Sequence, residues 1–318
     1  MQQLLEQIAK LHVLVIGDLM VDHYIWGDAS RLSPEAPVPV VRVGHDTYTE
    51  GGAANVAANL RALGVRTSIV GAFGTDAFGR MLETGLAKRG VACGDAWRSD
   101  SIATVVKTRV MCRNQQLCRI DRENAPSAYA LPDAHVESLR GAIAAADAVI
   151  LSDYAKGVIT SELVRHVQAL ARPGQVVALD PKPRPELCFT DVTLTTPNRA
   201  EALQLAGLSD TEEGFPVTDV LARIRERHRP KHLVVTMGGE GMLFDTGKRL
   251  PTAAREVFDV SGAGDTVIAT MTAALAAGAD IECAAALANL AAGVVVGKLG
   301  TATASPVEIL AHAAVAHE

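Results

Sequence analysis

The sequence predicts an α/β fold with a doubly wound, mostly parallel central sheet. Short apolar runs recur along the 318 residues, and most of them end in a polar residue followed by turn residues. Runs of this kind are typical of strands buried on both faces of a parallel sheet, and the helical segments between them complete βαβ units. No tandem repeat, linker or low-complexity tract divides the chain, so we expect one domain over residues 1–318.

The composition is that of an ordinary folded protein, with 48% hydrophobic and 21% charged residues. A net charge of −6 and only 4% aromatic residues argue against nucleic-acid binding. Residues 1–10 show no signal sequence and no apolar run reaches about 18 residues, so we expect no membrane partner. Five cysteines without a CxxC pair fit a reduced, cytoplasmic protein.

The first strand, residues 12–16, is a short apolar run that ends at Gly17 and Asp18. In open α/β sheets this carboxyl end faces the ligand crevice, where Asp18 is either a turn former or an acceptor for ligand hydroxyls. The same alternation of apolar runs and turns predicts the remaining elements. We expect strands at 67–72, 148–153, 175–180, 192–196 and 232–236, and helices at 50–64, 77–89, 267–277 and 283–296 and from residue 160.

Two β segments interrupt this order, and we expect them to form a small lid. Residues 22–43 contain three prolines followed by alternating β-branched residues, which favours extended or edge strands. Residues 104–121 alternate over two arms around a polar turn near 113–115, which is the pattern of a hairpin. Lys107 and Arg109 fall on one face of it, as solvated surface or, over a pocket, as an anion clamp.

Two glycine-rich helix starts are candidate binding loops. Residues 262–264 (Gly-Ala-Gly) precede a helix whose free backbone N–H groups and dipole favour an anion. Asp265 follows, either as the helix N-cap or as the base that takes a proton from a hydroxyl beside a phosphoryl group. Residues 51–52 (Gly-Gly) repeat the pattern, and Asn55 one turn later is either a satisfied core amide or a ligand contact.

Common nucleotide-binding motifs are incomplete in this sequence. Residues 293–299 resemble a P-loop, but the segment is one residue short and carries Leu299 where Ser or Thr must hold Mg²⁺. The third glycine of a dinucleotide fingerprint is missing after Gly264. Neither a P-loop kinase nor a Rossmann dehydrogenase is therefore supported.

Four motifs, in order, resemble those of the ribokinase-type (PfkB-type) carbohydrate kinases. They are Gly51-Gly52-x-x-Asn55, Asn198-x-x-Glu201, Thr236-x-Gly238-x-x-Gly241 and Asp259-x-x-Gly262-Ala263-Gly264-Asp265-Thr266. The resemblance covers residues 10–312 and implies a ribokinase-like fold, in which helices flank a mostly parallel sheet and a small β lid covers the sugar. It also implies ATP as phosphoryl donor and Mg²⁺ as cofactor, and it leaves open a monovalent cation such as K⁺.

The resemblance gives each motif residue an expected role. Asp265 becomes the base that deprotonates the sugar hydroxyl, while the amides of Gly262, Ala263 and Gly264 neutralise the migrating phosphoryl group. Mg²⁺ and the ATP phosphates are placed with help from Asn198 and Glu201. The nucleotide lies beside Thr236, Gly238 and Gly241. The sugar hydroxyls are held by Asp18, Gly51, Gly52 and Asn55.

Three further segments, residues 30–40, 113–116 and 152–157, closely resemble the heptose 7-phosphate kinases within this family. This implies ATP-dependent phosphorylation of the anomeric C1 hydroxyl of heptose 7-phosphate, for ADP-heptose and lipopolysaccharide core synthesis. A phosphorylated substrate accounts for the surplus of cations: Arg31, Lys107, Arg109, Arg113, Lys156, Lys182 and Arg184. We expect the lid group, Arg109 first, to clamp the 7-phosphate, while Lys156 or Lys182 could equally meet nucleotide phosphates.

Expected partners and rival interpretations follow from the same resemblance. Related lids often mediate dimerisation, so we expect a homodimer through residues near 22–43 and 104–121. Many relatives carry a fused nucleotidyltransferase domain, whereas this chain stops at Glu318, so we expect a single-function kinase that depends on a separate nucleotidyltransferase. The rivals are another sugar kinase of this fold, for ribose, fructose or a hexose phosphate, and a non-catalytic sugar-phosphate-binding regulator.

Overall fold

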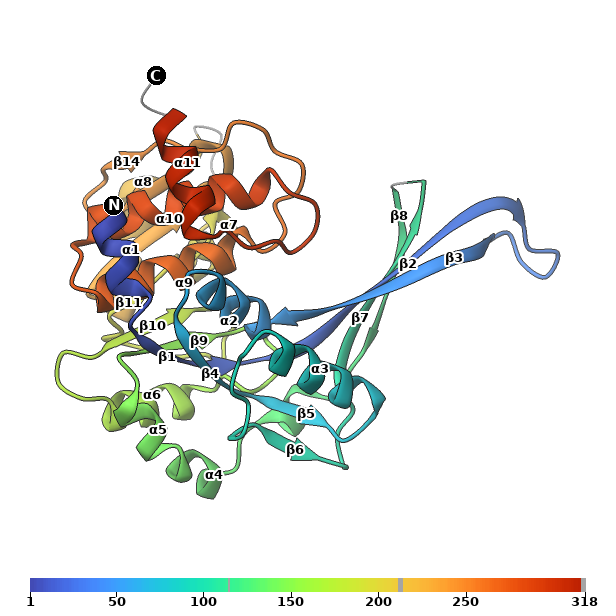
Figure 1. The fold of residues 1–318 in the computed structure, drawn as a ribbon, viewed down its shortest axis with the longest axis horizontal. Helices are drawn as coiled ribbons and strands as arrows, with labels where there is room; N and C mark the ends of the chain where they lie inside the picture. The colour runs from blue at the N-terminus through green and yellow to red at the C-terminus, as the bar shows by residue number, and fades with distance from the viewer. Residues whose placement is uncertain (114, 211–213, 316–318) are drawn as a thin grey trace.

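A central sheet carries the strand ends on which the site is built. The computed structural model describes residues 1–113, 115–210 and 214–315 (Figure 1). Among them, eight strands form this sheet in the order β14-β13-β12-β11-β10-β9-β1-β4, parallel from β12 to β4 and antiparallel only at the β13–β14 edge. The predicted mostly parallel sheet is therefore confirmed. Its strands are β1 (His12–Gly17), β4 (Arg66–Val70), β9 (Ala148–Ser152), β10 (Val176–Asp180), β11 (Leu194–Thr195), β12 (His232–Thr236), β13 (Met242–Phe244) and β14 (Arg249–Leu250).

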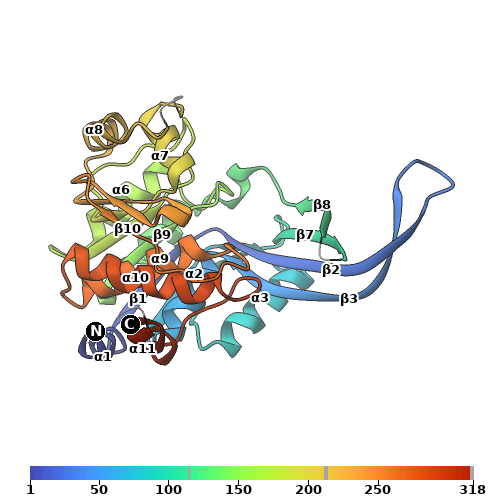
Figure 2. The ribbon, with the colours of Figure 1, turned by 90° about the horizontal axis from the view of Figure 1, so that it is seen from above.

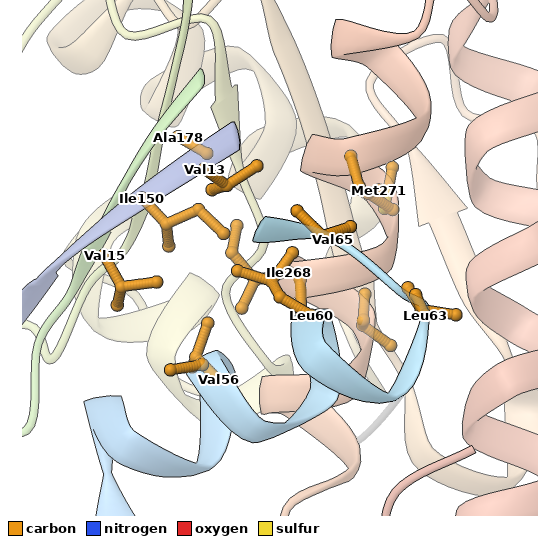
Figure 3. Packing of buried hydrophobic residues seen from close by; sticks show 14 of the residues in the cluster. Val13, Val15, Val56, Leu60, Leu63, Val65, Ile150, Ala178, Ile268 and Met271 are labelled. Atoms are coloured by element: carbon orange, nitrogen blue, oxygen red, sulfur yellow. The ribbon is translucent and has the colours of Figure 1, made fainter. Parts of the chain in front are cut away.

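Both faces of the sheet are buried, as its continuous apolar strands require. Along β1, Val13 and Val15 belong to one hydrophobic core, and Leu14 and Ile16 belong to another on the opposite face. Figure 3 shows the first core, where the strand residues meet Ile268 and its neighbours on the covering helices. Alternate side chains of a strand point to opposite faces, so one apolar run supplies two cores.

Helices cover the sheet in two layers (Figure 2). The first core takes residues from α1 (Gln2–Ile8), α2 (Ala53–Ala62), α3 (Ala77–Lys88), α9 (Ala263–Ala276), α10 (Ile281–Val296) and α11 (Pro306–Val315). The second takes residues from α4 (Asp133–Ser138), α5 (Arg140–Ala145), α6 (Ser161–Leu170), α7 (Arg199–Ala206) and α8 (Val217–His228). Two short 3-10 helices, η1 (Pro126–Tyr129) and η2 (Gly238–Glu240), and a two-stranded sheet of β5 (Ala72–Gly74) and β6 (Trp97–Ser99) belong to the same body.

A second sheet projects from this body as a long ribbon (Figures 1 and 2). Its order is β3-β2-β7-β8, from β2 (Leu19–Leu32), β3 (Pro39–Gly52), β7 (Val105–Cys112) and β8 (Gln115–Arg122). The strands match the two expected β segments, but β2 and β3 extend beyond 22–43, because their pairing continues down to Leu19 opposite Gly52. The predicted hairpin turn includes Asn114, which lies outside the described residues.

Within the described ranges, no helix has the length and apolar character needed to cross a bilayer. The most apolar segment of the sequence forms α10, and most of that helix packs into the first core.

Candidate functional site

The late glycine motif forms the start of helix α9. Gly262 is the N-cap residue with a φ of 79°, and the helix begins at Ala263, earlier than the expected residue 267. Asp265 therefore lies inside the first turn, so the alternative that it is the N-cap is wrong. A positive φ at Gly262 is readily adopted only by glycine, which is the physical reason for that residue here.

Asp265 is hydrogen-bonded on both carboxylate oxygens. Asn55 Nδ2 donates to Oδ2 at 2.7 Å, and the Tyr154 hydroxyl donates to Oδ1. Loss of solvent around this carboxyl raises its pKa to about 6, and the two hydrogen bonds oppose the rise. The fold thus brings together Asn55 and Asp265, which lie 210 residues apart in the sequence. The pKa of the Asp265 carboxyl in this pocket is closer to neutral than that of an ordinary aspartate.

The packing of α2 against α9 fixes this arrangement. Asn55 is only 2% exposed, and a Cβ at Gly262 would lie 2.6 Å from its Nδ2. One turn further along both helices, Thr266 Oγ1 donates to Asn59 Oδ1 at 2.8 Å in the buried interface. Because these contacts leave little freedom to the Asn55 amide, it points at Asp265 without needing a ligand to order it.

The early glycine pair lies where the lid sheet enters the body. A Cβ at Gly51 would stand 2.1 Å from Asp22 Oδ2, and Gly52 has a φ of 63° at the start of α2. Asp22 in turn pairs with Arg109 at 2.5 Å, and it is 7% exposed. Gly51 therefore makes room for the Asp22 carboxylate that holds Arg109, a contact that the sequence did not reveal.

Asp18 organises the loop that follows β9. Its carboxylate accepts hydrogen bonds from the backbone amides of Tyr154, Lys156 and Val158 at 2.7–3.0 Å, and the residue is 1% exposed. Asp18 directly follows β1, at the carboxyl end of that strand, as predicted. Both carboxylate oxygens of Asp18 accept hydrogen bonds from the protein's own backbone. The predicted contact of Asp18 with sugar hydroxyls therefore stays a prediction.

A cavity of about 870 Å³ lies beside the start of α9, where Ala263 and Gly264 belong to its lining. This is the size of a small-ligand site, and most of its lining is apolar. Six of the predicted residues line it, although they come from three separate motifs: Asn198, Thr236, Gly238, Gly241, Ala263 and Gly264. Glycine is required at Gly241, where φ is 89° and a Cβ would lie 2.1 Å from the Leu250 carbonyl oxygen.

The Asn198-x-x-Glu201 motif is a helix capping box at the start of α7. Asn198 Oδ1 accepts from the Glu201 amide at 3.0 Å, and Glu201 Oε2 accepts from the Asn198 amide at 2.9 Å. Lys182 Nζ donates to the other Glu201 oxygen at 3.0 Å. In the part of the chain described, no three His, Cys, Asp or Glu residues are grouped to hold a metal ion by themselves.

Two predicted cations lie away from the crevice of their own chain. Arg31 is exposed near the end of β2, about 12 residues beyond Leu19, which places it roughly 40 Å out along the strand. Arg113 follows β7 and pairs with Asp28 at 2.9 Å, with 77% of its side chain exposed. The structure therefore does not bring either of them together with Asp265, since the lid is much longer than the sequence indicated.

Sequence reasoning overlooked three side chains that this geometry brings to the site. Tyr154 donates to Asp265, and Asp22 holds Arg109. Burial, followed by the carboxylates of Glu201 and Asp265, raises the pKa of Asp180 well above its ordinary value. Asp180 ends strand β10 just as Asp18 follows β1, so the strand-end pattern could have identified it.

Comparison with known protein families identifies the class to which this chain belongs. The pattern of the pfkB family carbohydrate kinases matches residues 10–308, and the chain belongs to this family. It is accordingly an ATP-dependent carbohydrate kinase.

Similar curated proteins are named Bifunctional protein HldE. The one from Pelobacter propionicus is 42% identical over 324 residues, covering 99% of this chain and 66% of that protein. The one from Escherichia coli O9:H4 is 41% identical over 313 residues, covering 97% and 65%. The chain thus spans 61–66% of the length of the curated relatives it matches. Because these relatives are named bifunctional, the expected dependence on a separate nucleotidyltransferase gains no support.

Solved structures share the fold at low sequence identity. Ribokinase from Arabidopsis thaliana, complexed with ribose and ATP, has a TM-score of 0.74 and 21% identity, covering 95% of this chain and 98% of that one. Phosphofructokinase-2 from Escherichia coli, in complex with potassium, has a TM-score of 0.74 and 19% identity, covering 97% and 100%. These similarities confirm the expected ribokinase-like architecture.

Proposed function

We propose that this kinase phosphorylates the anomeric C1 hydroxyl of D-glycero-D-manno-heptose 7-phosphate, for ADP-heptose and lipopolysaccharide core synthesis. The similarity to proteins named HldE supports the sugar. The observation that carries the proposal is the position of Asp265. It directly follows Gly264, which lines the cavity together with Ala263, and burial raises the pKa of its carboxyl while the positive charge of Lys107 on the lid has the smaller, opposite effect.

Asp265 is the general base of the proposed reaction. Its carboxylate takes the proton of the C1 hydroxyl, and the sugar oxygen forms a bond to the γ-phosphorus of ATP. The bond from that phosphorus to the bridging oxygen breaks, and ADP leaves with the electron pair. The backbone amides of Gly262, Ala263 and Gly264 donate towards the phosphoryl oxygens, where charge accumulates. With a pKa of about 6, Asp265 is largely ionised at neutral pH.

The nucleotide occupies the cavity beside Thr236, Gly238 and Gly241 in this proposal. Mg²⁺ typically takes one or two carboxylates, with waters and substrate phosphates as its other ligands. Glu201 and Asn198 supply oxygen ligands, and Asp180 adds a carboxyl group whose pKa is raised by burial first and then by the neighbouring carboxylates. When bound, Mg²⁺ would neutralise phosphate charge. Parallel assays in K⁺ and Na⁺ measure whether a monovalent cation is required.

On the acceptor side, Asn55 and the Gly51-Gly52 backbone line the sugar pocket, and Asp18 shapes its loop. We further propose one kinase domain over residues 1–318, located in the cytoplasm, where its five free cysteines stay reduced. The lid exposes several large apolar side chains, which supports a homodimer through this sheet. They include Leu32, Val43, Leu117 and Ile120, between 41% and 66% exposed. Sedimentation of Val43→Asp, expected to be monomeric, tests the dimer.

The decisive experiment measures ADP release with Mg-ATP for the wild type and Asp265→Asn. The acceptors are heptose 7-phosphate, unphosphorylated heptose, ribose, fructose and fructose 6-phosphate. Turnover confined to the phosphorylated heptose, and reduced by several orders of magnitude in the variant, supports both substrate and base. Efficient turnover of ribose or fructose keeps the kinase chemistry and refutes the heptose assignment. No turnover with any sugar favours the non-catalytic regulator.

A further inference from the structure

We propose that the phosphate group of the acceptor binds at a cation site in which Lys107 makes the primary contact. The site consists of Lys107 and Arg109 on lid strand β7 and Lys156 on the loop after β9. This inference rests on the proposed function and adds to it the residue that selects a phosphorylated sugar.

The three cations differ in how they are paired. Arg109 is held by Asp22 at 2.5 Å, and Lys156 is held by Glu123 at 2.6 Å. Lys107 has no carboxylate within 4.0 Å among residues 1–113, 115–210 and 214–315, and its ammonium lies over the ring of Tyr154, with Nζ 5.8 Å from the centroid. Of these three cations, Lys107 is therefore the one whose positive charge no carboxylate neutralises by direct contact.

The environment of Lys107 makes this excess charge costly without a ligand. Burial and then the neighbouring Lys156 ammonium lower the pKa of Lys107, and Arg109 and Arg119 act in the same direction, while Asp22 opposes them. A partly buried ammonium among other cations is destabilised unless an anion joins it. A phosphate dianion supplies several acceptor oxygens and forms charge-assisted hydrogen bonds with such groups.

The position of Lys107 relative to the base fits one substrate molecule. Tyr154 lies between them, because its ring lies under Lys107 and its hydroxyl donates to Asp265. A single aromatic side chain thus separates the proposed anion site from the proposed base. A sugar phosphate with its reacting hydroxyl at one end and its phosphate at the other can bridge this separation.

The geometry favours Lys107 over Arg109 as the primary phosphate contact, whereas the sequence analysis expected Arg109 to be the first of the lid cations. Arg109 is engaged by Asp22 and stacks 5.2 Å from the centroid of the Tyr24 ring. Binding a phosphate would require it to share or leave this carboxylate. Lys107 has no such partner to give up, so it contributes more to discrimination between phosphorylated and unphosphorylated sugars.

The test compares Lys107→Met with the wild type, using heptose 7-phosphate and unphosphorylated heptose as acceptors. We expect kcat/KM for the phosphorylated sugar to fall tenfold to about a hundredfold, mainly through KM, with less than about a threefold change for the unphosphorylated one. Lys107→Arg should restore part of the preference. Lys88→Met, which removes an exposed lysine of α3, is the matched control and should change neither value.

Equal losses for both sugars, or no loss for either, would overturn the inference. Calorimetric titration of each protein with heptose 7-phosphate and with fructose 6-phosphate, without ATP, supplies a readout independent of turnover. Lys107-dependent binding of fructose 6-phosphate but not of the heptose supports the anion site while rejecting the heptose assignment. Binding of heptose 7-phosphate that is unchanged in Lys107→Met rejects the anion site while leaving the proposed reaction intact. Unfolding curves verify that each variant is folded.

Discussion

The hydrogen bond from Tyr154 to Asp265 gives a sharp prediction about the pH dependence of catalysis. Tyr154→Phe removes the hydroxyl that donates to Asp265 Oδ1 and leaves the ring under Lys107 in place. Asn55 continues to donate to the other oxygen at 2.7 Å. The variant therefore changes one contact of the proposed base and keeps the shape of the pocket.

The expected shift in the pKa of Asp265 follows from the free energy of the hydrogen bond that Tyr154 donates. A hydrogen bond to a charged group contributes about 1.5–3 kcal/mol, and one pKa unit corresponds to about 1.4 kcal/mol. The Tyr154 bond favours the ionised carboxylate, so its loss raises the pKa of Asp265 from about 6 by roughly one to two units. Since the ionised form is the base, activity should fall at low pH and recover at high pH.

The assay is kcat/KM for the acceptor from about pH 5 to about pH 9, because this parameter reports ionisations of the free enzyme. The acid limb should move upward in Tyr154→Phe, with the two proteins converging at the alkaline end. Tyr129→Phe is the matched control, because that buried hydroxyl donates to the Ala103 carbonyl, away from Asp265. An unshifted acid limb with a uniform loss of activity would refute the role assigned to Tyr154.

Three further variants probe stability, the cavity and the capping box. Arg184→Ala should lower the free energy of unfolding by about 3–5 kcal/mol, measured by denaturant titration, because it leaves the fully buried Asp153 carboxyl without its 2.6 Å partner. Gly241→Ala should raise KM for ATP, since its Cβ would lie 2.1 Å from a backbone oxygen, whereas Gly247→Ala, at a similar φ with open space around it, should not. Glu201→Gln should raise the Mg²⁺ concentration needed for half-maximal rate, and an unchanged Mg²⁺ dependence would remove that residue from the proposed metal site.

The sequence by itself determined six of the eight strands of the central sheet and the two glycine-rich helix starts. The apolar run at 12–16 and its counterparts define strands because continuous burial leaves no room for polar residues on either face. Gly262 marked a helix start because its backbone conformation is one that other residues rarely adopt. These signals are local, since a few neighbouring residues suffice to produce them.

Only the tertiary structure decided which side chains meet. The register of β2 against β7 sets Asp22 beside the cations of the lid, and the length of the ribbon carries Arg31 away from the crevice. The loop after β9 folds back on Asp18 and thereby brings Tyr154 to Asp265. Partners that are far apart in the sequence depend on strand register and helix packing, and no local pattern records them. For this reason the sequence identified the cations of the lid, but it did not identify Lys107 as the one that lacks a carboxylate partner.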